Sequence, residues 1–265
     1  MKYLMINGSP HKGNSWKVAE LIKNELQAIS DEAVFEEIHL ADLNLAFCHG
    51  CSACFRKGHA HCPHYGIISA TIDAMSHAAG VIVVTSTFFF RETALTKNFM
   101  DHLCFMTHRP QFFQGKALVI ATATVAGARM AAKSVASFLG AIGFNRSYLL
   151  AASTFSWNNY QPTEHLKRKA ASLAIKFHKD VSSKKFNSPA WGLLIPYNLF
   201  RGLFPSFRKG SEYETEDGVY WTEPQRARYA YDVSIPLSFH KRLFGGIFYQ
   251  IGRLAGRFVT VTYRK

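Results

Sequence analysis

The sequence predicts an α/β protein built on a doubly wound, five-stranded parallel sheet, and two observations carry this prediction. Short apolar runs alternate with amphipathic segments of helical spacing five times in succession. Two of the runs, 81–84 (VIVV) and 118–121 (LVIA), are continuously apolar, which is typical of parallel strands that helices cover on both faces. Ligands of such sheets bind at the carboxyl ends of the strands.

The individual elements follow from these patterns. Strands are predicted at 3–7, 34–40, 81–86, 117–123 and 148–152. Helices are predicted at 15–29, 67–77, 94–106, 128–139 and 163–181. In the first helix, for example, Val18, Ile22 and Leu26 share one face, and Lys17 and Glu20 lie on the other.

The chain of 265 residues is long enough for an α/β domain of about 180 residues and an appended segment. The alternation stops near residue 183, so we predict a domain at 1–183 and a C-terminal extension at 184–265. No run approaches the roughly 20 apolar residues of a membrane-spanning helix. The N-terminal run is also too short for the apolar core of a signal peptide. The sequence therefore predicts a cytoplasmic protein.

A turn rich in small residues, Gly8–Ser15 (GSPHKGNS), joins the first predicted strand to the first helix. Backbone N–H groups and the helix dipole converge at such a helix N-terminus, which predicts an anion site. The turn matches neither the Walker pattern nor G-x-G-x-x-G, so a monophosphate such as that of FMN fits better. A plain strand-to-helix turn with a serine cap is the alternative. The expected contact residues are Ser9, His11, Lys12, Gly13, Asn14 and Ser15.

This loop resembles the first loop of the NADPH-dependent FMN reductase family, which commonly reads Gly-Ser-Pro, a few residues, and then Asn-Ser or Asn-Thr. Two further segments match that family in order, 85–101 (TSTFFFRETALTKNFMD) and 122–128 (TATVAGA). The resemblance covers about residues 1–180 and implies a flavodoxin-like fold, bound FMN, and a homo-oligomer, at least a dimer, that completes the flavin site. It implies contacts with the isoalloxazine ring by Thr87, Phe88, Phe89, Phe90 and Arg91. It also implies FMN contacts by Thr124, Val125, Ala126 and Gly127.

The first of these segments departs from the family pattern. Ser86-Thr87-Phe88-Phe89 stands where the family usually has Ser-Pro-x-Tyr. The missing proline loosens the turn, and phenylalanine in place of tyrosine removes a hydroxyl. The ring contacts of the family are therefore assigned to these residues by their position in the segment and not by the chemistry of their side chains. An aromatic core strand is the alternative for the three phenylalanines.

Four cysteines lie within fifteen residues, spaced as Cys48-x2-Cys51-x2-Cys54-x7-Cys62. Short spacings of this kind hold iron–sulfur clusters or zinc, and the repeated two-residue gap favours a [4Fe–4S] cluster. The run resembles that of the iron-sulfur flavoproteins, a branch of the same fold. Zinc and free or redox-active thiols are the alternatives. Cys104, in the predicted helix 94–106, is expected to be a buried small hydrophobe outside the cluster.

The predicted extension is strongly basic. The chain has a formal net charge of +13, and residues 184–265 contain 13 Lys and Arg against 6 Asp and Glu. Residues 241–258 form a cationic amphipathic helix, which suits either an anionic membrane surface or packing on the rest of the protein or a second subunit. No nucleic-acid-binding module appears, so a nucleic-acid partner is not expected. The segment 217–221 is expected to be a turn leading into an aromatic strand or lid.

Together, the motifs predict an FMN-dependent oxidoreductase in which the cysteine cluster passes single electrons onward. NAD(P)H is the expected reductant, and a small molecule or a protein is the expected acceptor. A cluster-free NAD(P)H-dependent reductase of FMN or quinones and a membrane-associated electron carrier are the alternatives. Since the cofactors perform the chemistry, no acid–base pair or nucleophile is expected.

Overall fold

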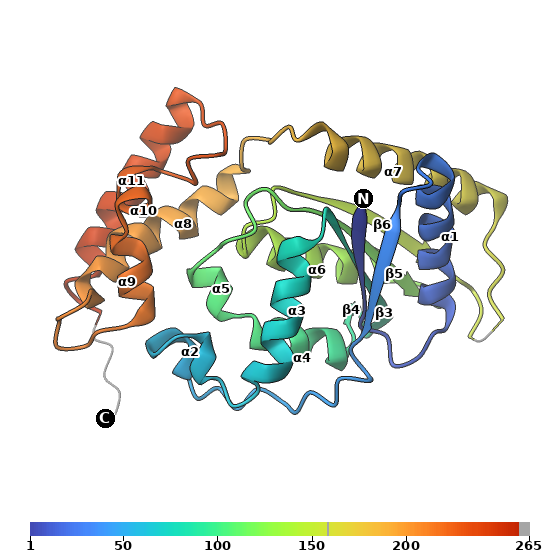
Figure 1. Ribbon diagram of the computed structural model, residues 1–265, viewed down its shortest axis with the longest axis horizontal. Helices are drawn as coiled ribbons and strands as arrows, with labels where there is room; N and C mark the ends of the chain where they lie inside the picture. Colours follow the sequence, from blue (N-terminus) through green and yellow to red (C-terminus); the bar gives the residue numbers. More distant parts are fainter. Residues whose placement is uncertain (158, 260–265) are drawn as a thin grey trace.

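The computed structural model describes residues 1–157 and 159–259, and it contains the predicted sheet (Figure 1). Five parallel strands hydrogen-bond in the order β2-β1-β3-β5-β6. Their bounds are β1 Lys2–Asn7, β2 Val34–His39, β3 Gly80–Phe88, β5 Lys116–Ala123 and β6 Arg146–Ser153. The winding direction reverses between β1 and β3, so the carboxyl ends of these two strands form the expected ligand crevice. The predicted fold class is confirmed.

Helices cover both faces of the sheet. One face carries α1 (Asn14–Ile29) and α7 (Glu164–Ser183); the other carries α3 (Tyr65–His77), α4 (Ala94–His102), α5 (Phe105–His108) and α6 (Ala128–Ala141). The alternating side chains of β1 divide the two cores. Tyr3 and Met5 join the core beneath α1 and α7. Leu4 and Ile6 join the core on the opposite face.

The predicted helix at 94–106 is wrong in one respect, because the structure divides it into α4 and α5. The backbone N–H of Leu103 donates to Met100 O as well as Phe99 O, and that of Cys104 donates to Asp101 O, which tightens the turn and ends the first helix. Cys104 is exposed at this joint, so its expected burial is also wrong. Its neighbours Leu103 and Phe105 fill the core positions instead.

The third strand is longer than predicted and turns back on itself. β4 (Arg91–Glu92) pairs antiparallel with the end of β3, and Phe89 and Phe90 form the tip of the hairpin, both with positive φ. Positive φ at both tip residues is typical of the tightest hairpin turns. The exposed fractions of the Phe88, Phe89 and Phe90 side chains are 58%, 93% and 46%. An aromatic core strand is therefore excluded.

Between β2 and α3 the chain forms the loop that carries the four clustered cysteines. This loop contains two short helices, α2 (Ala53–Arg56) and the 3-10 helix η1 (His59–His61). None of its residues between 53 and 61 is fully buried. Figure 1 shows α2 on the side of the sheet that faces the C-terminal helices.

The C-terminal helices gather beside the sheet around a core of their own (Figure 1). They are α8 (Trp191–Leu203), the 3-10 helix η2 (Phe204–Phe207), α9 (Glu216–Thr222), α10 (Pro224–Arg228) and α11 (Phe239–Ala255). Trp221 is the largest fully buried side chain of the described residues and lies in this core. No helix of the described residues is long and apolar enough to span a bilayer.

Two predictions for this region have different outcomes. The amphipathic helix is present as α11, displaced by two or three residues at its ends from the predicted 241–258. The strand or lid predicted at 217–221 is wrong, because these residues form α9. The Thr215 side chain accepts a hydrogen bond from Gly218 N, and Glu216 and Asp217 place negative charge at the helix N-terminus.

Candidate functional site

The predicted phosphate loop lies at the carboxyl end of β1, where hydroxyl groups of the loop, α1, β3 and β5 meet. Ser15 Oγ lies 2.9 Å from Ser86 Oγ and 2.6 Å from Thr122 Oγ1. Ser9 Oγ lies 3.0 Å from the same Ser86 hydroxyl. This chain of hydroxyls joins the ends of β1, β3 and β5. Ser86 and Thr122 were not predicted as site residues, although Ser86 is the last residue of one predicted strand and Thr122 the next-to-last residue of another.

The N-terminus of α1 is open towards this crevice. Gly13 occupies the N-cap position, and no side chain of the described residues caps the helix through a hydrogen bond. The serine-capped turn is therefore not formed, and N–H groups of the first turn face the position where an anion would satisfy them. His11 and Lys12 are exposed at the rim. Lys12 Nζ lies 3.6 Å from Glu37 Oε2, so part of its charge is already paired.

Gly8 allows α4 to approach the loop closely. A Cβ atom at Gly8 would lie only 2.0 Å from Thr96 Oγ1, so a larger residue would push α4 away. Thr93 and Thr96 donate hydrogen bonds to Gly8 O, the latter at 3.3 Å. The start of the loop is thereby fixed to the helix that follows the hairpin.

Asn14 connects the loop to the segment that follows β6. Its Nδ2 donates to the backbone oxygens of Ser156 at 2.9 Å and Trp157 at 3.1 Å. Its Oδ1 is buried and has no hydrogen-bond partner among the described residues. Segment 154–157 was not predicted as part of the site. The sequence could have indicated this segment, because it follows the last predicted strand and therefore lies at the same edge of the sheet as the loop.

The hairpin tip and the segment after β5 are in contact. Gly127 has a φ of +96°, and a Cβ atom there would lie 2.8 Å from Phe90 Cδ1. Phe155 N donates to Thr124 O at 2.8 Å, and Ser153 Oγ donates to Val125 O at 2.6 Å. The structure therefore brings the predicted segments 87–91 and 124–127 together at one edge of the sheet.

Exposed apolar side chains collect on these joined segments. They are Phe88, Phe89, Phe90, Val125, Phe155 and Trp157. Buried Thr87 Oγ1 and Glu92 Oε2, at the base of the hairpin, have no hydrogen-bond partner within the described part of the chain. An anion site bordered by aromatic surface and by polar atoms without partners suits a ligand that combines a phosphate with a planar, polar-edged ring. FMN is such a ligand.

The four clustered cysteines line one cavity of about 60 Å³, together with His49, His64 and Asp101. Cys48 and Cys51 are exposed, whereas Cys54 and Cys62 are half-buried. Burial raises the pKa of the Cys54 thiol to about 11, and neighbouring Cys62 adds to the increase. Within the described residues, no group of three or more His, Cys, Asp and Glu side chains is arranged to hold a metal ion. The thiols share a cavity without forming a coordination site.

Asn98 of α4 holds the entry of the cysteine loop. Its Oδ1 accepts a hydrogen bond from Cys48 N at 3.1 Å, and its Nδ2 donates to the carbonyl oxygens of Leu45 and Ala46 at 3.0 and 3.1 Å. On the same helix, His102 lies 2.8 Å from His64, the two rings being joined through Nε2 and Nδ1. Burial and the neighbouring His102 lower the pKa of His64.

Arg109 holds the other side of the cysteine loop and links it to the C-terminal helices. Its Nη2 donates to Cys54 O at 2.6 Å, and its Nη1 donates to Phe55 O at 3.4 Å. Nη1 also pairs with Asp217 of α9, whose other oxygen lies 2.7 Å from His108 Nδ1. Asp217 is only 2% exposed. Sequence reasoning missed this link because its members are about 55 and 108 residues apart.

The sequence of residues 1–161 matches the family model described as NADPH-dependent FMN reductase. The chain belongs to this family. The phosphate loop, the hairpin and segment 124–127 all lie within the matched residues. The resemblance predicted from the loop is thereby confirmed, whereas the cysteine cavity lies in the match without being explained by the family description.

Relatives of this FMN reductase family member include proteins named iron-sulfur flavoprotein. One, from Archaeoglobus fulgidus, is 36% identical over 101 residues, which are 38% of this chain and 48% of the relative. Iron-sulfur flavoprotein MJ1083 from Methanocaldococcus jannaschii is 34% identical over 103 residues, 38% of this chain and 51% of the relative. The alignments thus span about half the length of these curated relatives.

Solved structures share the fold of this family member. The flavoenzyme NAD(P)H:(acceptor) oxidoreductase FerB from Paracoccus denitrificans aligns with a TM-score of 0.50 at 16% identity, covering 69% of this chain and 98% of FerB. An oxidoreductase from Corynebacterium diphtheriae aligns with a TM-score of 0.50 at 17% identity, covering 70% of this chain and 99% of that chain. At these identities the likeness concerns the fold alone.

Proposed function

We propose that this chain is an oxidoreductase that uses NAD(P)H and holds FMN in the crevice at the carboxyl ends of β1, β3 and β5. The observation that carries the proposal is the open N-terminus of α1 beside exposed aromatic side chains on three joined segments. The proposed FMN contacts are Ser9, His11, Lys12, Gly13, Asn14, Ser15, Thr87, Phe88, Phe89, Phe90, Arg91, Thr124, Val125, Ala126 and Gly127.

In this proposal the residues of the chain bind and orient the cofactor. The N–H groups at the start of α1 and the hydroxyls of Ser9 and Ser15 hold the phosphate. The hairpin tip and segment 124–127 lie along the ring and exclude water from part of it. Asn14 Oδ1 and Thr87 Oγ1 offer hydrogen-bond capacity that no residue in the described part of the chain uses. Bound FMN supplies hydride acceptance and one-electron transfer.

Titration of the FMN-free protein with FMN, followed by quenching of flavin fluorescence, tests this site. Ser15→Ala removes a hydroxyl from the crevice and is expected to weaken binding about tenfold, the effect of one hydrogen bond to a charged group. Ser172→Ala, at an exposed position of α7, is the matched control and should bind as the wild type does. Equal affinity in both variants would contradict the phosphate site. Oxidation of NADH and NADPH by the FMN-loaded protein then identifies the reductant.

We further propose that Cys48, Cys51, Cys54 and Cys62 hold a [4Fe–4S] cluster. Two facts support the proposal: four thiols line one cavity, and relatives that match this chain are named iron-sulfur flavoprotein. Thiolates are the ligands that such clusters require. A bound cluster would supply one-electron transfer, while Asn98 and Arg109 hold the loop that carries the ligands.

Iron and acid-labile sulfide analysis of anaerobically purified protein tests the cluster. Cys51→Ser should remove most of the iron, because it removes a ligand. Cys104→Ser is a sharp control, since Cys104 is also exposed but does not line the cavity. An iron content in the wild type no higher than background would contradict the cluster. The cluster-free NAD(P)H-dependent reductase of FMN or quinones, which the lack of a preformed metal group among the described residues favours, would then stand.

We propose two partners in addition to a small-molecule or protein electron acceptor. A second copy of the chain covers the exposed aromatic surface at the flavin crevice, which makes the protein a homo-oligomer. An anionic membrane surface meets α11, whose outward side chains Phe239, Leu243, Ile247, Ile251 and Leu254 are exposed beside basic residues. A cytoplasmic protein of this kind would work as a membrane-associated electron carrier.

A further inference from the structure

Arg201 of α8 is buried without the hydrogen bonds that a guanidinium requires. Its side chain is 7% exposed, and among the described residues neither Nε nor Nη1 has a hydrogen-bond partner. Its Cζ atom lies 4.4 Å from the centre of the Tyr249 ring of α11. The ring stabilises the face of the cation, but it cannot accept hydrogen bonds from the N–H groups, which point outwards in the plane of the guanidinium. A buried charge with donors left unused is costly, so this position lacks an acceptor.

Arg201 lines a cavity of about 530 Å³ between α8, α11 and the segment that joins α10 to α11. Arg228 and Arg242 line the same cavity and are exposed at its rim. Arg242 Nε donates to Leu237 O at 3.1 Å, which fixes this guanidinium at the entrance. The remaining walls include the apolar side chains of Tyr229, Val233 and Ile235. The cavity therefore combines three guanidinium groups with an apolar lining.

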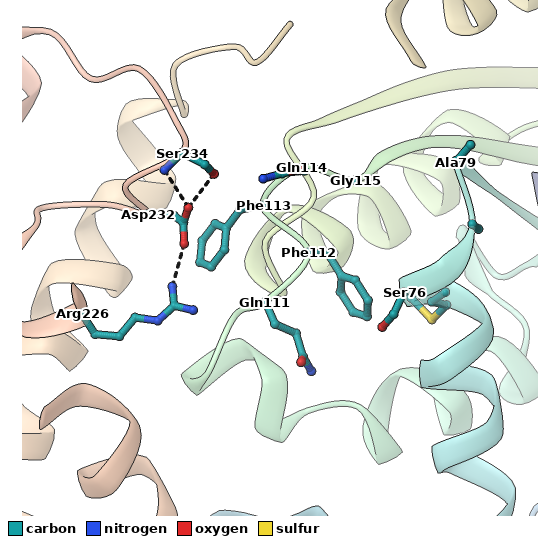
Figure 2. A pocket seen from close by; sticks show the side chains of 12 residues that line it. Ser76, Ala79, Gln111, Phe112, Phe113, Gln114, Gly115, Arg226, Asp232 and Ser234 are labelled. Carbon is teal, nitrogen blue, oxygen red and sulfur yellow. Dashed lines mark hydrogen bonds and ion pairs between the residues drawn. The ribbon is translucent and has the colours of Figure 1, made fainter. Parts of the chain in front are cut away.

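Asp232, the acidic residue among the described lining of this cavity, does not neutralise it. Its Oδ2 accepts a hydrogen bond from Arg226 Nη1 at 2.8 Å, and its Oδ1 accepts from the backbone N and the hydroxyl of Ser234 at 3.0 and 2.6 Å. Figure 2 shows these contacts from the neighbouring pocket, where Arg226 and Asp232 lie opposite Phe113. The carboxylate is thus already engaged, and the charge of the three cavity arginines stays in excess.

We propose that this cavity binds the phosphate group of an amphipathic ligand, either the headgroup of an anionic glycerophospholipid or a soluble phosphate monoester. Arginine presents several donors in one plane, and this geometry matches phosphate oxygens. A phosphate group presents oxygens in several directions, whereas a carboxylate presents two in one plane, so guanidinium groups on different walls of the cavity suit a phosphate. The apolar walls accommodate the carbon portion. The site is independent of the flavin chemistry, and its lipid form rests on the proposed membrane contact of α11.

The test uses full-length protein saturated with FMN, so that the phosphate loop at α1 is occupied. One arm measures flotation with vesicles of phosphatidylglycerol and phosphatidylcholine, compared with phosphatidylcholine alone. The other arm measures binding of glycerol 3-phosphate by calorimetry, with glycerol as the neutral probe. The variants are Arg201→Gln, the rim variant Arg242→Gln, and Arg208→Gln, which removes the same charge from an exposed position outside the cavity.

We expect Arg201→Gln and Arg242→Gln each to weaken binding about tenfold and Arg208→Gln to leave it nearly unchanged. If the wild type floats with anionic vesicles and the two cavity variants do not, the ligand is a lipid headgroup. If the wild type binds glycerol 3-phosphate but does not float with vesicles, and the two cavity variants lose that binding, the ligand is soluble and the lipid form is overturned. Equal losses in Arg208→Gln and Arg242→Gln would show attraction by net charge alone and overturn the site. Absence of binding in both arms would overturn it as well. Arg242→Gln keeps the test valid if Arg201→Gln does not fold.

Discussion

At the scale of single residues, Asp217 connects the C-terminal helices to residues at the C-terminal end of α5. Its buried carboxylate pairs with Arg109 and His108, and Arg109 donates to the carbonyl oxygens of Cys54 and Phe55. The ion pair between Arg109 and Asp217 therefore connects the cysteine loop to the C-terminal helices. Removing one member of such a pair leaves the other charge buried and uncompensated.

Asp217→Asn tests this link. We expect the free energy of unfolding to fall by about 3 kcal/mol, the usual cost of breaking a buried ion pair, and the iron content to fall with it. Urea unfolding measures the first effect and metal analysis the second. Glu212→Gln removes an exposed carboxylate of the same region and should change stability by less than about 0.5 kcal/mol. Equal stability of the two variants would contradict the link.

Gly127 tests the contact between the hairpin and the segment after β5. Gly127→Ala places a Cβ atom 2.8 Å from Phe90 Cδ1 at a φ of +96°, so we expect a loss of about 1–2 kcal/mol in stability and weaker FMN binding. The control is Gly66→Ala on α3, where a Cβ atom meets nothing within 4 Å. Thermal unfolding measures the stability of the two variants, and FMN titration measures their affinity for FMN. Unchanged FMN affinity in Gly127→Ala would separate this contact from the cofactor site.

At the scale of elements, α8 and α11 pack through glycines while α11 presents apolar side chains outwards. A Cβ atom at Gly252 would lie 2.2 Å from Leu199 O, and one at Gly202 would lie 2.2 Å from Tyr249 O. The two backbones are therefore closer than larger residues would allow. The amphipathic pattern predicted α11 correctly but not its orientation, because glycines form the closest contact with α8 and most of the apolar stripe faces outwards. Phe244 is the part of the stripe that contacts Trp191 of α8.

Two substitutions on α11 test this packing. Gly252→Ala is expected to destabilise the protein by more than about 2 kcal/mol, because backbone atoms must move apart. Gly246→Ala, on the same helix with no atom within 4 Å of the added Cβ, should stabilise it by up to about 1 kcal/mol through helix propensity. Thermal unfolding compares them. A stable Gly252→Ala variant would mean that α11 is not held in this position.

Apolar periodicity was sufficient for the five main strands because most of them are buried on both faces. Apolar periodicity was insufficient where apolar residues are not buried or where a helix breaks without a change in the apolar pattern. A core strand was the alternative interpretation of Phe88 to Phe90, which form an exposed hairpin tip. The break between α4 and α5 leaves the apolar pattern of 94–106 unchanged. The place of the loop 8–15 between β1 and α1 was predictable because its pattern is contained in eight consecutive residues. The Asn98 and Arg109 contacts with the cysteine loop join distant residues and leave no local pattern.

At the scale of the whole molecule, the proposed flavin crevice and the cysteine cavity lie on one chain that also carries exposed apolar surface. The most exposed aromatic side chains at the crevice are Phe89, Trp157 and Phe155, at 93%, 83% and 78%. Exposed apolar surface of this kind on a folded protein marks an interaction site. A second copy of the chain is the proposed occupant.

Phe89→Asp tests the proposed oligomer. A charge at this position should weaken self-association at least tenfold and lower FMN affinity, since the second copy would complete the crevice. Phe239→Asp, on α11 and 74% exposed, places the same charge away from the crevice and should leave association unchanged. Sedimentation velocity over a range of concentrations measures both. A monomeric wild type would contradict the proposal.

In the proposed function, FMN and a one-electron centre work together in this chain. An anaerobic reductive titration of the purified protein with dithionite counts the electrons taken up per FMN. About three electrons are predicted, two for the flavin and one for a [4Fe–4S] cluster. An uptake of two electrons would contradict the cluster and leave a simple flavin reductase. A protein that retains no flavin after incubation with FMN and removal of free FMN by gel filtration would contradict the proposed FMN site itself.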